Sequence, residues 1–392
     1  MVDGDAAKGR AGRLAALVAA EAEQAERDRR LTEPVMAAAA DCGLFSMAVP
    51  VSFGGEGAGL RELLDTTRTI AAACPASAWT LSFFVLHNWL LTRFPEQLQA
   101  EVFGPRGYGL VPAPLAPTGQ LRPVDGGWEV SGRWEWATGV DHADWVMVHG
   151  LEARDDTFAL RFAVLPIGDV EVDDVWHTSG MRATGSNTVR VEGVFVPDHR
   201  TLPSDDLLED RAPEPGNSEM AALPVMAVLS LVASAPALGA AEAAVEHYAD
   251  RIRERVLAYT LGDKAIDQPA AQVRLGHALA QVRAAHVLFE AAADQLLDAV
   301  TATDSESGGS VGLDVRMGVR LAAANVVRLC NEVISLVCAG AGASVYQLSH
   351  PLQRLQRDVE VLKGHVVFDW DRTAELAGRI ELGLPLRPAD RI

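Results

Sequence analysis

The sequence is poor in cysteine and in basic residues. Its four cysteines, at positions 42, 74, 330 and 338, do not show the CxxC spacing of a zinc site. We therefore expect reduced cysteines in the core of a cytoplasmic protein, without a disulfide framework. Lys and Arg number 34 against 53 Asp and Glu, which gives a net charge of −19. Because so acidic a surface repels nucleic-acid phosphates and anionic lipids, we expect no nucleic-acid or membrane partner.

Common cofactor and hydrolase motifs are also missing. The chain has no P-loop, HExxH or GxSxG motif, and we predict no metal site. The glycine-rich stretch 54–59 does not follow a strand of a βαβ unit, which argues against a Rossmann fingerprint. Residues 221–241 carry no charge and are long enough to span a bilayer. Pro224, Pro236 and a high alanine content favour a buried helix in a large helical core instead.

The residues that are present divide the chain into three regions. Residues 1–105 read as an N-terminal helical domain. Residues 106–200 form short β-type runs separated by turn residues, typical of a small antiparallel β-domain. Residues 201–392 return to long Ala-rich helices and predict a C-terminal four-helix-bundle domain. The Pro-, Asp- and Glu-rich stretch 198–218 reads as an exposed connector, so an acidic linker at 201–218 opens this last domain. Segregated helices and strands predict an α+β fold.

One predicted helix in the first region combines aromatic residues with a histidine. It begins near Pro75 and carries Trp79, Phe83, His87 and Leu90 at helical spacing. This spacing places the four side chains on one face. A lone histidine on an apolar face is more often a hydrogen-bonded core residue than a functional group, so spacing alone leaves both interpretations open.

Four stretches resemble the acyl-CoA dehydrogenase fold, and together they extend over nearly the whole chain. They are Cys74–Trp79 with His87–Trp89, Gly132–Trp145, Gly180–Thr188 with Val194–Pro197, and His350–Asp358 with His365. The chain is most similar to the flavin-dependent monooxygenases of two-component systems, such as the oxygenase components of 4-hydroxyphenylacetate hydroxylases. The resemblance implies an acyl-CoA dehydrogenase-like order of helical, antiparallel β and helical-bundle domains, and a homotetramer.

The same resemblance implies a reaction. Reduced FMN or FAD would arrive from a separate flavin reductase, since no nicotinamide-binding motif is present. Its reaction with O2 would give a C4a-hydroperoxide that hydroxylates a small-molecule substrate. The expected substrate is an aromatic or polycyclic natural product of secondary metabolism. Residues 111–117 lack the serines of phenol hydroxylases of this type, which favours a bulkier ring system or an amine over a simple phenol.

The resemblance assigns the flavin contacts to the β-domain. Trp136 would offer apolar surface to the isoalloxazine ring, and Thr138 would offer a hydroxyl to the N5 edge. Thr138 is also expected to act in catalysis by slowing the loss of hydrogen peroxide. Ser186 and Asn187, in a glycine-containing turn before a strand, are expected to border the flavin.

Substrate contacts are assigned to helices. Trp79, Phe83 and His87 would line the substrate site, where the His87 imidazole would orient or deprotonate the substrate near neutral pH. His365 would assist near the oxygen site. Its spacing from Val361 predicts that it lies within a C-terminal helix.

Three alternatives remain open from the sequence. An N-oxygenase of a nucleotide-linked amino sugar would share the fold. An acyl-CoA dehydrogenase would need a carboxylate base, but the two regions where that fold carries one hold Val366 and Leu229. A dehydrogenase would therefore require a displaced base. The third alternative is a flavin-free helical assembly protein on the same scaffold.

Overall fold

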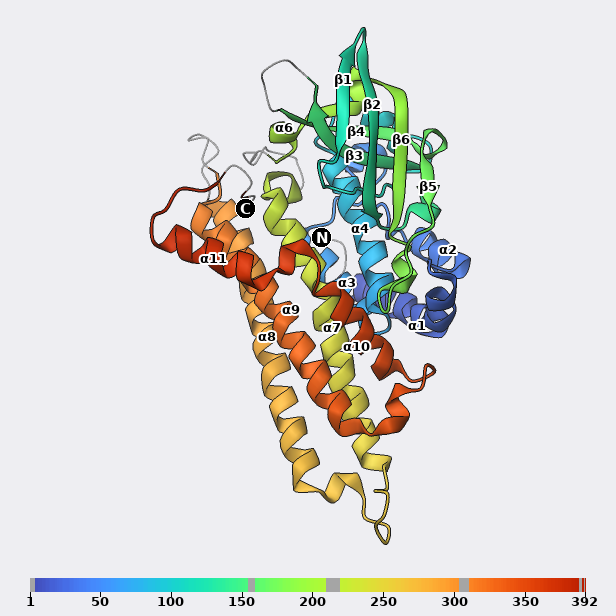
Figure 1. Cartoon of the computed structure of the whole chain (residues 1–392), viewed down its shortest axis with the longest axis vertical. Helices are drawn as coiled ribbons and strands as arrows, with labels where there is room; N and C mark the ends of the chain where they lie inside the picture. The colour runs from blue at the N-terminus through green and yellow to red at the C-terminus, as the bar shows by residue number, and fades with distance from the viewer. Residues whose placement is uncertain (1–3, 154–158, 209–218, 303–309, 388–389, 391) are drawn as a thin grey trace.

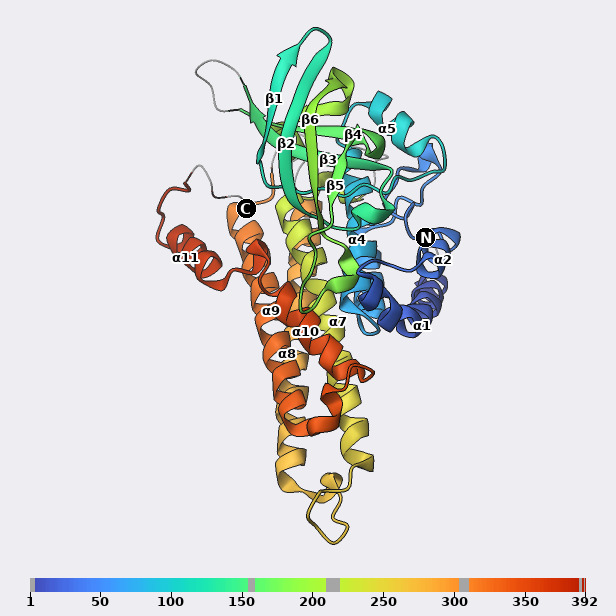
Figure 2. The same cartoon turned by 45° about the vertical axis from the view of Figure 1, so that its right-hand side comes forward.

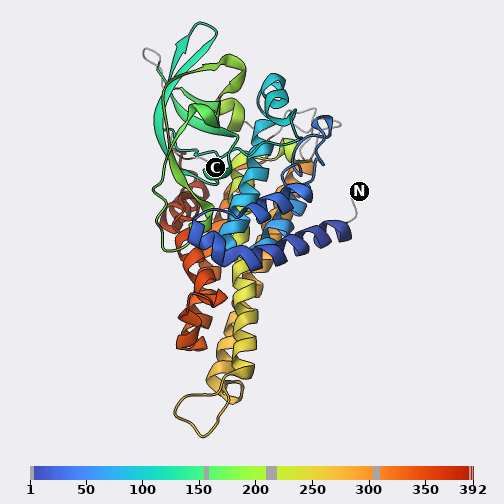
Figure 3. The same cartoon turned by 90° about the vertical axis from the view of Figure 1, so that its right-hand side faces the viewer.

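The computed structural model describes residues 4–153, 159–208, 219–302, 310–387, 390 and 392. The helices of the N-terminal region are α1 (Gly4–Asp28), α2 (Glu33–Asp41), α3 (Leu60–Ala71), α4 (Pro75–Leu91) and α5 (Glu96–Phe103). Helix α4 begins at Pro75, as the sequence predicted. The bounds of α2 follow from its sequence, since Pro34 lies in its first turn and Gly43, with φ of +77°, follows its end. These helices lie beside the upper part of the long C-terminal helices (Figure 3).

The described strands form one seven-stranded sheet in the order β5-β6-β2-β1-β3-β4-β7. They are β1 (Gly119–Val124), β2 (Gly127–Ala137), β3 (Trp145–Glu152), β4 (Leu160–Pro166), β5 (Glu171–Asp173), β6 (Asn187–Pro197) and β7 (Thr201–Pro203). The pairs are antiparallel, as expected, except that β1 and β3 run parallel. The chain reverses after β1 and again after β2, so β3 runs in the direction of β1. Strand β2 is already paired on both edges, which leaves β1 as the partner of β3.

The expectation of an exposed connector beginning at Asp198 is wrong for its first part. Strand β7 extends the sheet by pairing with β4, and α6 (Ser204–Leu208) follows at once. Leu202 and Leu207 are buried, so these residues belong to the core rather than to a linker. Residues 209–218 of the predicted connector lie outside the described residues.

The C-terminal region is dominated by three long helices, α7 (Val225–Glu254), α8 (Pro269–Ala302) and α9 (Leu313–Ala341), that extend away from the sheet (Figures 1 and 2). Two shorter helices, α10 (Pro351–Leu362) and α11 (Trp370–Glu381), pack beside them. Helices α7 and α9 are each long and apolar enough to cross a membrane. However, 89% of the apolar window of α7 and 56% of that of α9 are buried within the protein. The prediction that residues 221–241 form a core helix is therefore consistent with the structure.

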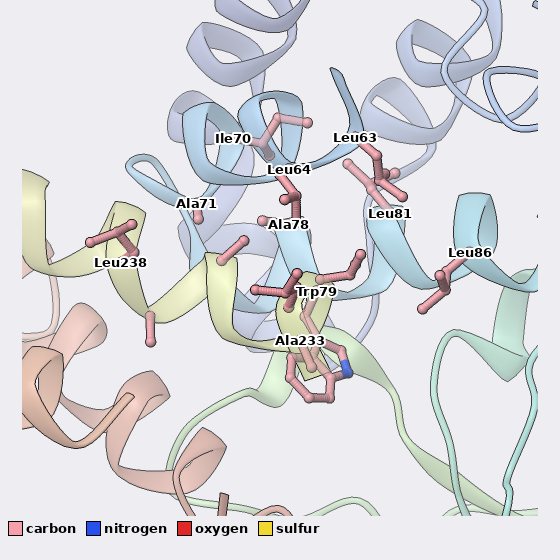
Figure 4. Close-up of a cluster of buried hydrophobic side chains, with 14 of the residues drawn as sticks. Leu63, Leu64, Ile70, Ala71, Ala78, Trp79, Leu81, Leu86, Ala233 and Leu238 are labelled. Atoms are coloured by element: carbon pink, nitrogen blue, oxygen red, sulfur yellow. The ribbon is translucent and has the colours of Figure 1, made fainter. Parts of the chain in front are cut away.

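Helix α4 is the innermost helix of the N-terminal region. Its sequence carries no Asp, Glu, Lys or Arg, and all of its residues are buried except Phe83. It packs against α3 and α7. Figure 4 shows Leu63 and Leu64 of α3 on one side of α4 and the Trp79 ring on the other. The four cysteines are free. Cys74, Cys330 and Cys338 are buried in the core, as the sequence predicted, whereas Cys42 is only half-buried.

Candidate active site

His87 has one ring nitrogen engaged and the other unpaired. Nδ1 lies 2.6 Å from the carbonyl oxygen of Val111, which can only accept, so Nδ1 carries the proton. Nε2 then holds a lone pair, and this buried atom has no hydrogen-bond partner among the described residues. Burial lowers the pKa of His87 to about 4, so the ring is neutral at physiological pH. An unpaired buried acceptor costs about 1–3 kcal/mol, which suits a position that receives a ligand donor.

Four rings form a continuous aromatic row, made of His87, Phe83, Trp79 and His365. Phe83 stacks on Trp79, with 4.5 Å between ring centroids and 18° between planes. The Phe83 ring also meets His87 edge-on at 5.5 Å, while His365 packs against Trp79 at 5.4 Å. The structure therefore brings together the predicted substrate-site residues and places a histidine at each end of the row.

The expectation that His365 lies within a helix is wrong. Helix α10 ends at Leu362, and His365, with φ of −67° and ψ of 138°, precedes the short 3-10 turn Val366–Phe368. Its Nδ1 accepts a hydrogen bond from the Val367 N–H at 3.4 Å, so the proton resides on Nε2. His365 is open to solvent, yet the protein packed around it lowers its pKa to about 4. His365 thus presents a donor, whereas His87 presents an acceptor.

The end of β2 forms a turn that displays Trp136 and Thr138. Trp136 has φ of +64°, which is rare for a residue with a side chain, and its ring is 62% exposed. The Thr138 N–H donates to the Trp136 carbonyl at 2.9 Å, and the Gly139 N–H donates to the Thr184 carbonyl at 2.8 Å. The turn is thereby fixed, with an apolar ring face and a half-buried hydroxyl two residues apart.

Three hydroxyl groups run in a line from this turn into the protein. Thr138 Oγ1 lies 2.9 Å from Ser186 Oγ, which lies 2.7 Å from Thr184 Oγ1. The Thr184 hydroxyl donates to the carbonyl oxygen of Met181 at 2.9 Å. Ser186 and Thr184 are 5% and 1% exposed, so the line is shielded from water. We call these three side chains the hydroxyl chain.

Asn187 does not join the hydroxyl chain. Its Oδ1 accepts hydrogen bonds from the N–H groups of Val175 and Trp176 at 3.0 and 3.1 Å, and its Nδ2 lies 3.5 Å from Asp141 Oδ2. The amide therefore holds a neighbouring loop in place. Asn187 also lines an open cavity of about 390 Å³, whose other lining residues include Arg29 and Asp141.

The nearby carboxylates are engaged in contacts that hold the structure together. Asp358 Oδ1 accepts a hydrogen bond from the Met181 N–H at 2.6 Å, and burial raises the pKa of Asp358 to about 6. Glu360 pairs with Lys363 at 2.6 Å and accepts from Asn331 at 2.8 Å. In the described part of the chain, no three His, Cys, Asp or Glu side chains are arranged to hold a metal.

Comparison with known proteins identifies the family. The acyl-CoA dehydrogenase N-terminal domain model matches residues 11–106, and the C-terminal domain model matches residues 231–370. A pigment production hydroxylase from a Rhodococcus species is 34% identical over 95% of this chain and 96% of its own length. The flavin-dependent monooxygenase oxygenase subunit HsaA of Rhodococcus jostii is 32% identical over 93% of this chain and 95% of its own.

The chain belongs to the flavin-dependent monooxygenases of the acyl-CoA dehydrogenase fold. The solved structure of XiaF from a Streptomyces species in complex with FADH2 and glycerol superposes with a TM-score of 0.91, at 25% identity over 99% of this chain and 97% of XiaF. The protein is therefore an oxidoreductase that uses reduced flavin. The exposed Trp136 ring, the Thr138 hydroxyl and the unpaired Nε2 of His87 fit such a cofactor and a substrate beside it.

Sequence reasoning missed two residues that organise this site. Thr184 lies two positions before Ser186 in a stretch that the sequence had singled out, but only the turn geometry shows that their hydroxyls meet. Val111 offers no side-chain signal at all, because its contribution is a backbone carbonyl that fixes the proton of His87. For Thr184, the only hint in the sequence is that it is separated from Ser186 by a single glycine. For Val111, nothing in the sequence points to its role.

Proposed function

We propose that this monooxygenase hydroxylates an aromatic ring that carries a hydroxyl or ring N–H group. The unpaired Nε2 of His87, at the end of the aromatic row, is the observation that carries this proposal. Relatives named as the oxygenase components of a resorcinol hydroxylase and a p-hydroxyphenylacetate 3-hydroxylase, 28% and 27% identical, support an aromatic substrate. Reduced flavin and O2 would supply the chemistry: one oxygen atom enters a substrate C–H bond, the other leaves as water, and the flavin is oxidised.

His87 would hold the substrate through an accepted hydrogen bond. A phenolic hydroxyl has a pKa near 10, whereas that of His87 is about 4. Full proton transfer across this gap of about 6 pKa units would cost roughly 8 kcal/mol. A hydrogen bond to Nε2 still pushes electron density into the ring and fixes which carbon faces the oxygen donor.

The remaining residues of the aromatic row would shape the substrate pocket. The half-buried Phe83 ring, supported from behind by the buried Trp79 ring on which it stacks, would offer an apolar face to an aromatic substrate. His365 would direct its Nε2–H toward the site of oxygen transfer, where a donor stabilises charge that builds up on a leaving oxygen. Because the segment from Val111 to Pro117 offers no serine hydroxyl, a larger ring system held mainly by stacking suits the site better than a simple phenol.

The flavin would lie against the turn at the end of β2. The Trp136 ring would cover part of the isoalloxazine, and the Thr138 hydroxyl would meet its N5 edge. Ser186 would act by supporting Thr138, and Asn187 by holding the loop beside the flavin.

The protein would work with a separate flavin reductase in the cytoplasm, as part of a homotetramer. The relatives named as oxygenase components support the separate reductase. Helix α8 supports assembly, because it buries Ala278 and Phe289 while Val273 and Val287 remain 59% and 66% exposed. Mass photometry of the purified protein should give the mass of four chains; a monomer would contradict the assembly.

The test of the proposed function is turnover with supplied reduced flavin. The protein is mixed with dithionite-reduced FMN or FAD, oxygenated buffer and an aromatic panel of resorcinol, p-hydroxyphenylacetate, naphthol, hydroxyanthraquinone and indole. We expect one or more panel compounds to gain a hydroxyl group, and hydrogen peroxide to be released when the substrate is absent. Protein that neither binds reduced flavin nor hydroxylates any panel compound would contradict the proposal.

A further inference from the structure

The hydroxyl chain has a fixed direction, which follows from proton counting. A carbonyl oxygen only accepts, so the Thr184 hydroxyl gives its single proton to Met181. Thr184 Oγ1 can then only accept from Ser186, and Ser186, having given its proton away, can only accept from Thr138. The Thr138 proton is therefore directed inward. The outward side of its oxygen offers lone pairs and no donor.

The anchor of the chain is rigid. The Met181 carbonyl also accepts from Trp176 Nε1 at 2.9 Å, and the Met181 N–H donates to Asp358 Oδ1 at 2.6 Å. Gly180 packs so closely on α10 that an added Cβ would lie 2.0 Å from the Arg357 carbonyl oxygen. Since the carbonyl at the inner end cannot rotate away, the proton order along the chain is set before any ligand binds.

This direction matters because the N5 atom of a flavin changes its hydrogen-bonding character with redox state. In the oxidised ring N5 is an acceptor, whereas in the reduced ring N5–H is a donor. An oxygen that can only accept forms a good hydrogen bond with N5–H of the reduced flavin. With the oxidised flavin, the same oxygen faces the lone pair of N5, no hydrogen lies between the two atoms, and no hydrogen bond forms. Resting on the flavin position proposed above, we infer that the hydroxyl chain Thr138–Ser186–Thr184 makes the site select reduced over oxidised flavin. Ser186 and Thr184 are then positioning residues that act through Thr138.

Removing the Thr184 hydroxyl at the inner end of the hydroxyl chain should allow the remaining hydrogen bonds to reverse their direction. In Thr184→Val the shape of the buried side chain is kept, but Ser186 no longer has an acceptor there and can donate to Thr138. Thr138 can then donate outward to an oxidised N5. One hydrogen bond gained by the oxidised form should lower the ratio of oxidised to reduced dissociation constants about fivefold to tenfold. Thr184→Ser keeps the hydroxyl and serves as the matched control.

The ratio is measured by anaerobic titration of each protein with FMN and FAD, oxidised and reduced, without any turnover. A tenfold fall in the ratio also lowers the midpoint potential of the bound flavin by about 30 mV, so a redox titration provides a second, independent measurement of the same effect. Ser186→Ala interrupts the chain at another residue and should shift the ratio in the same direction, so the test does not depend on Thr184→Val folding well.

The outcomes separate this inference from the proposed function. Ratios that fall in Thr184→Val and Ser186→Ala but not in Thr184→Ser would support it. An unchanged ratio in both folded variants, with reduced flavin still bound and substrate still hydroxylated, would overturn the inference alone. Wild-type protein that binds flavin in neither redox state would overturn the proposed function as well.

Discussion

The Nδ1 atom of His87 lies 2.6 Å from the carbonyl oxygen of Val111, and this bond decides what the rest of the imidazole can do. It places the proton on Nδ1 and leaves a lone pair on Nε2, enclosed by protein and unpaired. A histidine kept only for packing would be expected to satisfy both nitrogens, since an unmade buried hydrogen bond is costly. The arrangement instead prepares an acceptor for a ligand.

The first prediction separates the two nitrogens of His87. In His87→Asn the amide can replace Nδ1 toward Val111, but nothing replaces Nε2, whereas His87→Gln extends an acceptor toward the Nε2 position. We expect His87→Asn to lose hydroxylated product about fivefold to a hundredfold, because the buried donor group of the substrate is left without a partner at a cost of about 1–3 kcal/mol. Reduced flavin should still be consumed, with hydrogen peroxide released instead.

The measurement is product formed per reduced flavin oxidised, on whichever panel compound the wild type hydroxylates. His87→Gln should retain more of this yield than His87→Asn. Wild-type yield in His87→Asn would show that Nε2 does not hold the substrate.

The second prediction concerns stability in acid. Burial lowers the pKa of His87 from 6.5 to about 4. Between pH 6.5 and pH 4, the unfolded chain therefore binds a proton at His87 that the folded chain does not bind. This contribution to stability is complete above pH 6.5 and is lost as the pH falls toward 4. Urea unfolding of the wild type should lose about 2 kcal/mol more between pH 7 and 4.5 than that of His87→Asn. Equal losses in the two proteins would contradict the buried neutral state of His87.

The third prediction concerns Asp358, whose contribution to stability changes with pH in the opposite direction. Burial raises the pKa of Asp358 from 3.8 to about 6, so its contribution to stability is present below pH 3.8 and is lost as the pH rises through 6. Asp358→Asn keeps an oxygen for the Met181 N–H and removes the buried charge. We expect it to stabilise the protein by about 1–3 kcal/mol at pH 8 and to have little effect at pH 4.

Glu360→Gln is the control for Asp358→Asn. Glu360 lies two residues away, but the hydrogen bond from Lys363 lowers its pKa, so its neutral replacement should not stabilise the protein at pH 8. Thermal unfolding of both variants at the two pH values checks the prediction. A Tm for Asp358→Asn at pH 8 that is equal to or below the wild-type value would refute it.

The fourth prediction tests the contact that holds the hydroxyl chain against α10. An added Cβ at Gly180 would lie 2.0 Å from the backbone oxygen of Arg357, so Gly180→Ala must push the Met181 turn away. We expect a loss of about 1–3 kcal/mol in stability together with weaker binding of reduced flavin. Gly168→Ala meets open space and should change neither quantity. Normal flavin affinity in Gly180→Ala would show that the turn is not coupled to the flavin site.

The sequence was sufficient to predict the order of the domains and most of the aromatic row. Trp79, Phe83 and His87 lie four residues apart in each step, which places them on one face of a helix, so their contact needed only a correct helix. His365 misled the same reasoning, because its spacing from Val361 imitates a helix that in fact ends at Leu362. Gly364, directly after the C-cap Lys363, was the stop signal in the sequence, and following the hydrophobic spacing past it placed His365 wrongly.

The properties that decide the chemistry were not predictable from local pattern. The tautomer of His87 depends on a backbone carbonyl 24 residues away. The direction of the hydroxyl chain depends on residues from two separated turns, Thr138 and Thr184 with Ser186, that β2 and β6 bring together by pairing. Such relationships come from long-range packing, and hydrophobic patterning does not encode them.

The most direct test of the central claim is isotope labelling under ¹⁸O2. The protein is supplied with reduced flavin and the aromatic panel, and the masses of the products are measured by mass spectrometry. The account predicts one ¹⁸O atom in the hydroxylated product for each coupled turnover. A protein that labels no panel compound, and whose bound oxidised FAD is bleached by an acyl-CoA without oxygen, would be a dehydrogenase and would contradict it.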